Sequence, residues 1–176
     1  MNKLYKSLTG SFVNKTSQGT ALEELAQLIL KCIKGFYVTR KIRTGTNQFD
    51  CTVRNDYAIK CTVYDEIGSV IIAECKNEEG TPGNSYYHKL ADIINSCKSK
   101  DERGFGILFS REDAARTCKI IAREKFLQNN IILINICGKD LNEIVNKRNF
   151  LILLQEKIQT IKLDIRTKPE DHLLYK

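Results

Sequence analysis

The sequence predicts an α/β fold in which a mixed β-sheet carries helices on both faces. Two segments, residues 104–109 and 131–137, are apolar almost throughout, which is typical of central strands covered on both sides. A stretch with helical spacing lies between them, and a strand–helix–strand step of this length implies a right-handed parallel crossover. Alternating polar and apolar residues earlier in the chain predict antiparallel strands in the same sheet.

The first predicted helix begins at Thr20 and is stopped by Gly35. Its apolar residues follow the i, i+3, i+4, i+7 spacing of an amphipathic helix, namely Leu22, Leu25, Ala26, Ile29 and Ile33. Thr20 and Glu23 also have the spacing of a capping box, so a purely structural role is open to Glu23.

A β-hairpin and two further strands are predicted next. The hairpin comprises residues 36–43, a tight turn at 44–47 and residues 48–54. Asp50 lies on the more polar face of its strand. Residues 57–64 alternate again and predict an additional strand. Residues 69–76, SVIIAECK, predict a buried core strand with a polar end.

The second half of the chain alternates helices and strands. In chain order, the predicted elements are a loop at 78–84, a helix at 85–98, a strand at 104–109, a helix after Ser110, a strand at 131–137 and short helices at 141–145 and 150–161. We expect a single domain over residues 1–176, with a core at about 17–163 and a loose tail at 164–176.

Composition predicts an ordinary soluble globular protein. Of the 176 residues, 42% are apolar and 28% are charged, which argues against a disordered chain. No apolar run approaches the roughly 18 residues of a membrane span, and the N-terminus lacks the apolar block of a signal peptide. We therefore expect no membrane association and a cytoplasmic location.

Cysteine usage and charge narrow the function classes. Seven cysteines lack any C-x-x-C spacing and lie mostly in apolar segments, which predicts small buried side chains rather than disulfides or a zinc site. Only two histidines are present, so a histidine-rich metal centre is excluded. A net charge of +7 and an isoelectric point near 9.0 favour a polyanionic partner, DNA or RNA.

The polar end of the strand at 69–76 is the strongest candidate for chemistry. Side chains alternate along a strand, so Glu74 and Lys76 are expected on one face and Cys75 on the other. A buried charge requires a partner, and this spacing holds opposite charges side by side. The alternative is that these residues are polar only because the strand emerges into water there.

Together with Asp50, the Glu74-Cys75-Lys76 segment resembles the D…(D/E)-x-K pattern of the PD-(D/E)xK nuclease superfamily. Three further motifs resemble its restriction-endonuclease-like, Mrr-type branch, and they are Gly19 to Glu23 before the hairpin, Gly106 to Ser110 at a strand end, and the pair Asp140-Leu141. The resemblance covers about residues 17 to 163. It implies a restriction-endonuclease-like sheet flanked by helices.

The resemblance also implies a divalent-metal site. Mg²⁺, with Mn²⁺ as a substitute, would be held by Asp50, Glu74 and the backbone carbonyl of Cys75, because hard cations prefer oxygen ligands. Lys76 would orient and help deprotonate the attacking water or stabilise the transition state, and Glu23 would be a further catalytic carboxylate. The segment between Asp50 and Glu74 is long for this superfamily, so Asp56 or Asp65 could be confused with the first carboxylate of the pattern. We prefer Asp50, because it lies in the hairpin strand that should run beside the strand at 69–76.

The function that the resemblance implies is a Mg²⁺-dependent endonuclease that hydrolyses DNA phosphodiester bonds, with defence against foreign DNA as a candidate role. The small size implies a homodimer or a partner subunit. Two alternatives stay open. One is a catalytically inactive nucleic-acid-binding or dimerisation module, and the other is a nuclease effector domain activated by a partner or sensor.

Two other groups of residues are weaker candidates for DNA contact. Residues 86–89, Tyr-Tyr-His-Lys, mix aromatic and basic side chains, although a core role for Tyr87 with the others solvated explains them more simply. A basic series that consists of Arg111, Arg116, Lys119, Arg123 and Lys125 suits a phosphate-contacting face, although such a series is more often the solvated side of a helix.

Overall fold

The computed structural model describes residues 15–43 and 48–164, which form one sheet with helices around it. The strands are β1 (Phe36–Arg43), β2 (Gln48–Asn55), β3 (Val70–Lys76), β4 (Gly104–Ser110) and β5 (Ile131–Ile136). The helices are α2 (Lys15–Lys31), α3 (Thr62–Ile67), α4 (Asn84–Cys97), α5 (Arg116–Asn129), α6 (Gly138–Val145) and α7 (Phe150–Lys162). The turn predicted at 44–47 and the tail predicted after Asp164 lie outside the described residues.

The sheet is mixed, and its strand order follows the chain order from β1 to β5. β2 pairs antiparallel with both β1 and β3, whereas β3, β4 and β5 run parallel to one another. The parallel steps are made through α4 and α5, as the predicted strand–helix–strand step implied. The predicted α/β architecture with a mixed sheet is confirmed.

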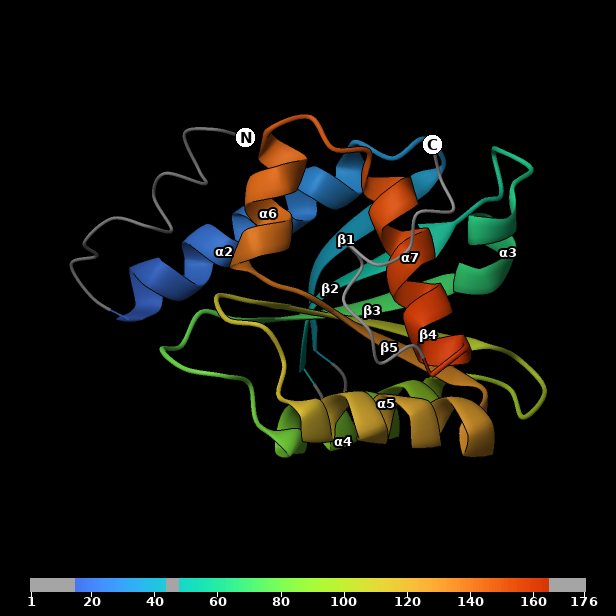
Figure 1. Ribbon diagram of the computed structural model, residues 1–176. Coiled ribbons are helices and arrows are strands. Elements are labelled where there is room, and N and C mark those ends of the chain that lie inside the picture. Colours follow the sequence, from blue (N-terminus) through green and yellow to red (C-terminus); the bar gives the residue numbers. More distant parts are fainter. Residues whose placement is uncertain (1–14, 44–47, 165–176) are drawn as a thin grey trace.

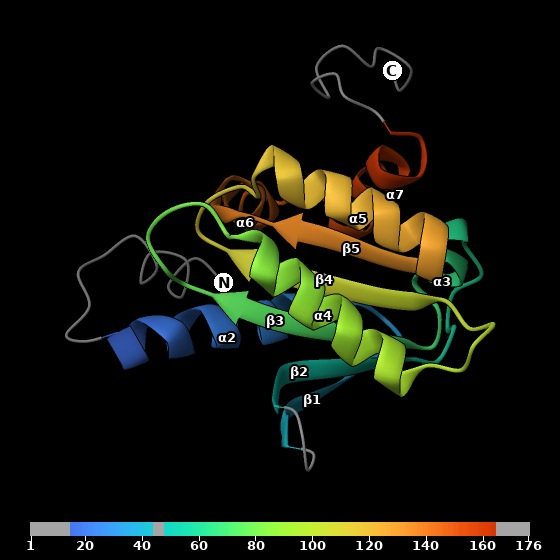
Figure 2. The same cartoon turned by 90° about the horizontal axis from the view of Figure 1, so that it is seen from below.

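Helices cover both faces of the sheet (Figure 1). α4 and α5 lie side by side on one face, and α2, α6 and α7 lie on the other. The buried residues accordingly form two hydrophobic clusters, one between the sheet and each helical layer. On the face that α4 covers, the edge of the sheet formed by β1 and β2 is not covered by helices, as Figure 2 shows. No helix within residues 15–43 and 48–164 is long and apolar enough to cross a membrane.

Helix α2 begins before the position that the sequence indicated. It starts at Lys15 and continues through Gly19 and Thr20 to Lys31. Thr20 is therefore inside the helix, and the predicted capping box with Glu23 is wrong. Residues 15–20 are polar or glycine, so the sequence there has no apolar spacing that would indicate the earlier start of the helix. Gly35, with φ of +82°, then turns the chain into β1.

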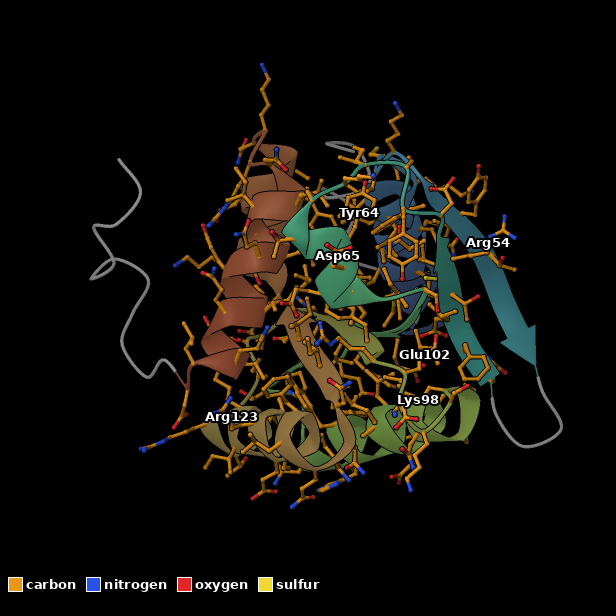
Figure 3. All side chains as sticks on the ribbon, turned by 90° about the vertical axis from the view of Figure 1, so that its right-hand side faces the viewer. Arg54, Tyr64, Asp65, Lys98, Glu102 and Arg123 are labelled. Atoms are coloured by element: carbon orange, nitrogen blue, oxygen red, sulfur yellow. The ribbon has the colours of Figure 1, made fainter. Side chains whose placement is uncertain are left out.

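The strand predicted at 57–64 is also wrong. Tyr57 has φ of +54°, which takes the chain out of the sheet directly after β2, and α3 follows instead. The buried side chain of Asn55 holds this turn by donating to the carbonyls of Tyr64 and Gly68 at 3.2 and 3.0 Å. Tyr64 is fully buried, and its O–H donates to the carbonyl of Lys34 at 2.6 Å (Figure 3).

Two glycines of β4 set how closely α4 approaches the sheet. A Cβ atom at Gly106 would lie 2.7 Å from Ile94 Cδ1 and 3.0 Å from Leu90 Cδ2, both on α4. A Cβ atom at Gly104 would lie 2.3 Å from Ile94 Cγ2. Any side chain at these positions would push α4 outward, so the glycines allow α4 to lie directly over the neighbouring strand ends.

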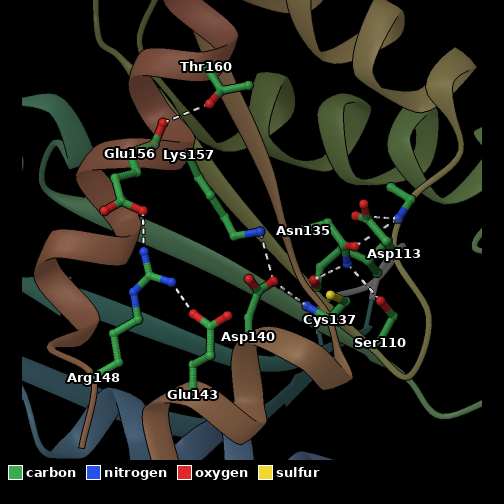
Figure 4. Close-up of polar contacts among 12 residues, drawn as sticks. Ser110, Asp113, Asn135, Cys137, Asp140, Glu143, Arg148, Glu156, Lys157 and Thr160 are labelled. Carbon is green, nitrogen blue, oxygen red and sulfur yellow. Dashed lines mark hydrogen bonds and ion pairs between the residues drawn. The ribbon is translucent and has the colours of Figure 1, made fainter. Parts of the chain in front are cut away.

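A buried amide fixes the ends of the parallel strands. Asn135 on β5 donates to the carbonyl of Leu108 at 2.9 Å and to Ser110 Oγ at 2.7 Å, and it accepts from the N–H of Ala114 at 3.0 Å (Figure 4). Strand β4 and the loop that follows it are thus tied to β5. Ser110, part of one motif in the resemblance, has a structural role in this network.

Asp140, from another of those motifs, is also placed in a structural contact. Its carboxylate accepts from the N–H of Cys137 at 2.8 Å and so helps to cap α6. It also pairs with Lys157 of α7 at 2.7 Å, which links the two helices (Figure 4).

The seven cysteines are free thiols. Three are buried, two are partly exposed, and Cys32 and Cys97 are exposed. The prediction of small buried side chains is therefore wrong for Cys32 and Cys97, which lie at helix ends where the buried stripe has finished.

Replacing Asn135 with alanine is expected to reduce the free energy of unfolding by about 2–4 kcal/mol, because buried groups on two strands and a loop lose their hydrogen-bond partner. Urea unfolding monitored by circular dichroism measures the change. Asn142→Ala, at an exposed position of α6, is the matched control and is expected to change stability by less than about 0.5 kcal/mol. Equal effects of the two substitutions would contradict the structural role of Asn135.

Candidate functional site

The end of β3 places Glu74 and Lys76 on the face covered by α4. Both side chains contact residues of that helix: Lys89 Nζ lies 3.1 Å from Glu74 Oε1, and Lys76 Nζ lies 4.8 Å from the centre of the Tyr86 ring. Cys75 points the other way and packs against the core cluster that includes α2. The alternation predicted from the sequence is therefore present.

Asp50 reaches the same strand end from β2. The last residue pair between β2 and β3 is Cys51 with Ala73, and beyond it the carboxylate of Asp50 accepts the N–H of Cys75 at 2.8 Å. A side-chain oxygen thus takes the place of a backbone carbonyl where the two strands separate. Because the N–H and C=O of one strand residue point to the same side, the carbonyl of Cys75 is also turned toward β2.

Glu74 is a nearly buried carboxylate, with 7% of the residue exposed. Burial raises the pKa of its carboxyl above the ordinary value, and the negative charge of Asp50 raises it further, whereas Lys89 and Lys76 lower it. Its Oε1 lies 3.1 Å from Lys89 Nζ and 4.0 Å from Lys76 Nζ. Its Oε2 is buried and has no hydrogen-bond partner within the described part of the chain.

Lys76 is held between a carboxylate and an aromatic ring. It lies 4.0 Å from Glu74 Oε1 on one side and over Tyr86 on the other. The Tyr86 O–H in turn donates to the carboxylate of Glu78 at 2.9 Å, which links the loop after β3 to α4. Both neighbours of Lys76 attract positive charge, so they hold its ammonium between them.

Lys89 is a site residue that the sequence did not identify as a partner of Glu74. The sequence indicates only a surface charge at this position, within the weak candidate for DNA contact at residues 86–89. Lys89 lies three residues after Tyr86 and one before the buried Leu90, which puts it at the border of the apolar stripe of α4. This spacing is the sequence signal that Lys89 faces the sheet. The contact itself depends on how closely α4 packs on the sheet.

Glu23 lies on the opposite, α2 side of the sheet. Burial is the main reason that the pKa of the Cys51 thiol is raised to about 12, and the charges of Asp50 and Glu23 add to it. The same two charges, after burial, act on the Cys75 thiol, whose pKa is raised well above the ordinary value. Glu23 is therefore near the strand end, but it is placed behind the sheet relative to Glu74.

Gln27 follows Glu23 by one helical turn and was not singled out by the sequence. It is buried, and its Oε1 has no hydrogen-bond partner among the residues that the structure describes. A buried amide oxygen without a partner is unusual, because an unmade hydrogen bond in the interior costs free energy.

The two other acids that could have been confused with Asp50 lie elsewhere. Asp56 follows β2 and accepts the N–H of Ala58 at 3.1 Å in the turn toward α3. Asp65 is exposed on α3. Both are near the beginning of β3, at the other end of the strand from Glu74, so the preference for Asp50 agrees with the geometry.

The carboxylates at this strand end offer only part of a metal site. No group of three or more His, Cys, Asp or Glu side chains is arranged to hold a metal ion in residues 15–43 and 48–164. The expected ligands, however, are two carboxylates and the carbonyl of Cys75, all of them oxygen donors. The unpaired Oε2 of Glu74 fits such a site, because a buried carboxylate oxygen without a donor can accept a cation.

The candidate site lies at a strand end, where Glu74 is nearly buried and the side chain of Lys89 is about half exposed. A cavity of about 240 Å³ lies elsewhere, between α3 and α7, and includes Glu66 and Lys162, which pair at 2.6 Å. None of the residues that line this cavity is one of the predicted site residues.

Comparison of the chain with family models, with curated proteins and with solved structures finds no match. The functional argument therefore rests on the residues and their geometry.

Replacing Asp50 with asparagine is expected to lower the pKa of the Glu74 carboxyl. The substitution removes a negative charge that opposes ionisation of Glu74, while the amide oxygen can still accept the N–H of Cys75. NMR titration of the Glu74 carboxyl carbon in metal-free buffer measures the shift. Asp65→Asn is the control and is expected to leave this pKa unchanged. An unchanged Glu74 pKa in Asp50→Asn would show that the two carboxylates are too far apart to act together.

Proposed function

We propose that this protein is a Mg²⁺-dependent nuclease that hydrolyses DNA phosphodiester bonds at the end of β3. The observation that carries the proposal is the meeting of two carboxylates and an ammonium at one strand end. Asp50 bonds the backbone next to Glu74, its charge acts on Glu74, and Lys76 lies on the same face. The mixed sheet with helices on both faces is compatible with the restriction-endonuclease-like architecture that the resemblance implies.

Asp50, Glu74 and the carbonyl of Cys75 would hold Mg²⁺, with Mn²⁺ as a substitute. When bound, the metal ion supplies positive charge to the nonbridging phosphate oxygens and lowers the pKa of a water molecule. Lys76, held on the same face as Glu74, would orient the water and stabilise negative charge on the phosphate.

Glu23 is not in a position to extend this set directly, because it approaches from the α2 side. We propose that it acts through the strand end, by adding negative charge behind Asp50 and Cys75. Gln27, with its unpaired oxygen, is adjacent on the same helix. The pair is a candidate to hold an ordered water behind the sheet.

Charge supports a nucleic acid as the substrate. The chain carries a net charge of +7, and Lys76 and Lys89 both lie at the strand end. Part of the basic series on α5 has other partners, since Lys119 pairs with Asp113 at 3.2 Å and Arg123 donates to the carbonyl of Ile161 at 2.9 Å. We therefore propose that DNA would contact the protein around the strand end rather than along α5. A homodimer or partner subunit, and a cytoplasmic role in defence, belong to the same proposal.

A second candidate function is an inactive nucleic-acid-binding module of the same fold. It is favoured by one observation, namely that the described residues contain no cluster of three metal-ligating side chains. In this case Glu74 with its two lysines would be a structural ion-pair network. An effector domain that requires an activating partner would combine the complete site with low activity of the isolated protein.

Glu74→Gln and Lys76→Ala are each expected to reduce the Mg²⁺-dependent conversion of supercoiled plasmid to nicked or linear DNA by at least about 100-fold, because each removes a charge from the reaction centre. Agarose-gel time courses in Mg²⁺, Mn²⁺ and EDTA measure the rates, and circular dichroism checks folding. Glu124→Gln and Lys119→Ala, both on the exposed surface of α5, are the matched controls and should retain wild-type rates.

Cleavage that persists in EDTA, or that survives both substitutions, would reject the nuclease site. DNA binding without turnover in either metal would favour the inactive module. Turnover that appears only with an added partner fraction, and that is still lost in Glu74→Gln, would favour the effector domain.

A further inference from the structure

The carboxylate of Glu74 already has a cationic partner in the protein itself. Lys89 Nζ lies 3.1 Å from Glu74 Oε1, within hydrogen-bond distance, and Lys76 Nζ is further away at 4.0 Å. Lys89 comes from α4, a different element from the strand that carries the other site residues. Its position is fixed by the close packing of α4 over Gly104 and Gly106.

The two members of this pair differ in their freedom to move. The Glu74 side chain is 10% exposed and is held in the strand, whereas the Lys89 side chain is 52% exposed. Lys89 can therefore turn its ammonium into solvent, while Glu74 has no alternative environment. Lys76 is only 26% exposed and is also held by the Tyr86 ring, so it is the lysine that stays.

We propose that Lys89 is an internal counter-ion for Glu74 that competes with the divalent cation and leaves the carboxylate when the cation binds. This inference rests on the metal site of the proposed function. A divalent ion bound by Glu74 would lie beside the ammonium of Lys89, and two positive groups at one carboxylate repel each other. Without the cation, Lys89 compensates a carboxylate that is otherwise too poorly solvated to carry its charge.

The arrangement sets a threshold for metal binding. The cation must displace a half-exposed ion pair, and such pairs contribute modestly, so the threshold is correspondingly low. Occupation of the site then depends on the divalent-cation concentration. The released ammonium would turn into solvent near the same strand end.

Lys89→Met is expected to bind Mn²⁺ about two- to fivefold more tightly than the wild-type protein, because the competing charge is removed while the length of the side chain is kept. Isothermal titration calorimetry with MnCl₂, without DNA, measures the affinity and needs no enzymatic activity. Lys89→Arg keeps the charge and is expected to bind Mn²⁺ within about twofold of wild type.

Lys119→Met is the matched control. Lys119 is 54% exposed and lies 3.2 Å from Asp113, so it has nearly the same exposure and pairing distance as Lys89, but it is on α5 and outside the site. It is expected to leave Mn²⁺ affinity unchanged.

The outcomes separate this inference from the proposed function. If wild type binds Mn²⁺, Glu74→Gln does not, and Lys89→Met binds no more tightly than wild type, the competition is overturned and the metal site stands. If wild type and Lys89→Met both fail to bind Mn²⁺, the metal site and the competition are overturned together. A gain in affinity equal in Lys89→Met and Lys119→Met would also overturn the competition, since it would reflect only the loss of net charge.

Discussion

The burial of one carboxylate, that of Glu74, governs the candidate site. A carboxylate that is 7% exposed at the end of a core strand cannot rely on water, so the protein must supply positive charge and hydrogen-bond donors. Two lysines approach one of its oxygens, and the other oxygen is left without a donor among the described residues. Burial raises the pKa of the Glu74 carboxyl and the negative charge of Asp50 raises it further, although both lysines lower it.

The fold creates this situation through the geometry of its strands. β2 and β3 are paired up to Cys51 and Ala73 and then separate, which exposes the backbone of Cys75 to the side chain of Asp50. β3 continues beside β4 as far as Lys76, so its end remains rigid after its other neighbour has left. Because β4 still holds the end of β3, this end can present Glu74, the carbonyl of Cys75 and Lys76 at the edge where Asp50 approaches.

Local pattern predicted most of the fold, because the core strands and helices bury nearly complete apolar faces. It failed where a few specific contacts decided the path. Residues 57–64 alternate like a strand, but the left-handed Tyr57 and the hydrogen bonds of Asn55 turn the chain into α3. Similarly, Thr20 has the residue type of a cap, but a cap requires the helix to begin there, and α2 has already begun at Lys15.

In the site, too, the contacts that follow from local sequence pattern could be predicted, and those that depend on tertiary packing could not. The common face of Glu74 and Lys76 follows from strand alternation, and the approach of Asp50 follows from the hairpin. The contact of Lys89 does not, because it depends on how far α4 lies above the sheet, and that distance is set by glycines more than ten residues later in the chain. Replacing a buried ion pair with apolar residues is often neutral or stabilising, so stability alone is a weak reason for a nearly buried Glu74 with an unpaired oxygen. The proposed exchange of an internal ammonium for an external cation would account for both the burial of Glu74 and the oxygen that has no donor among the described residues.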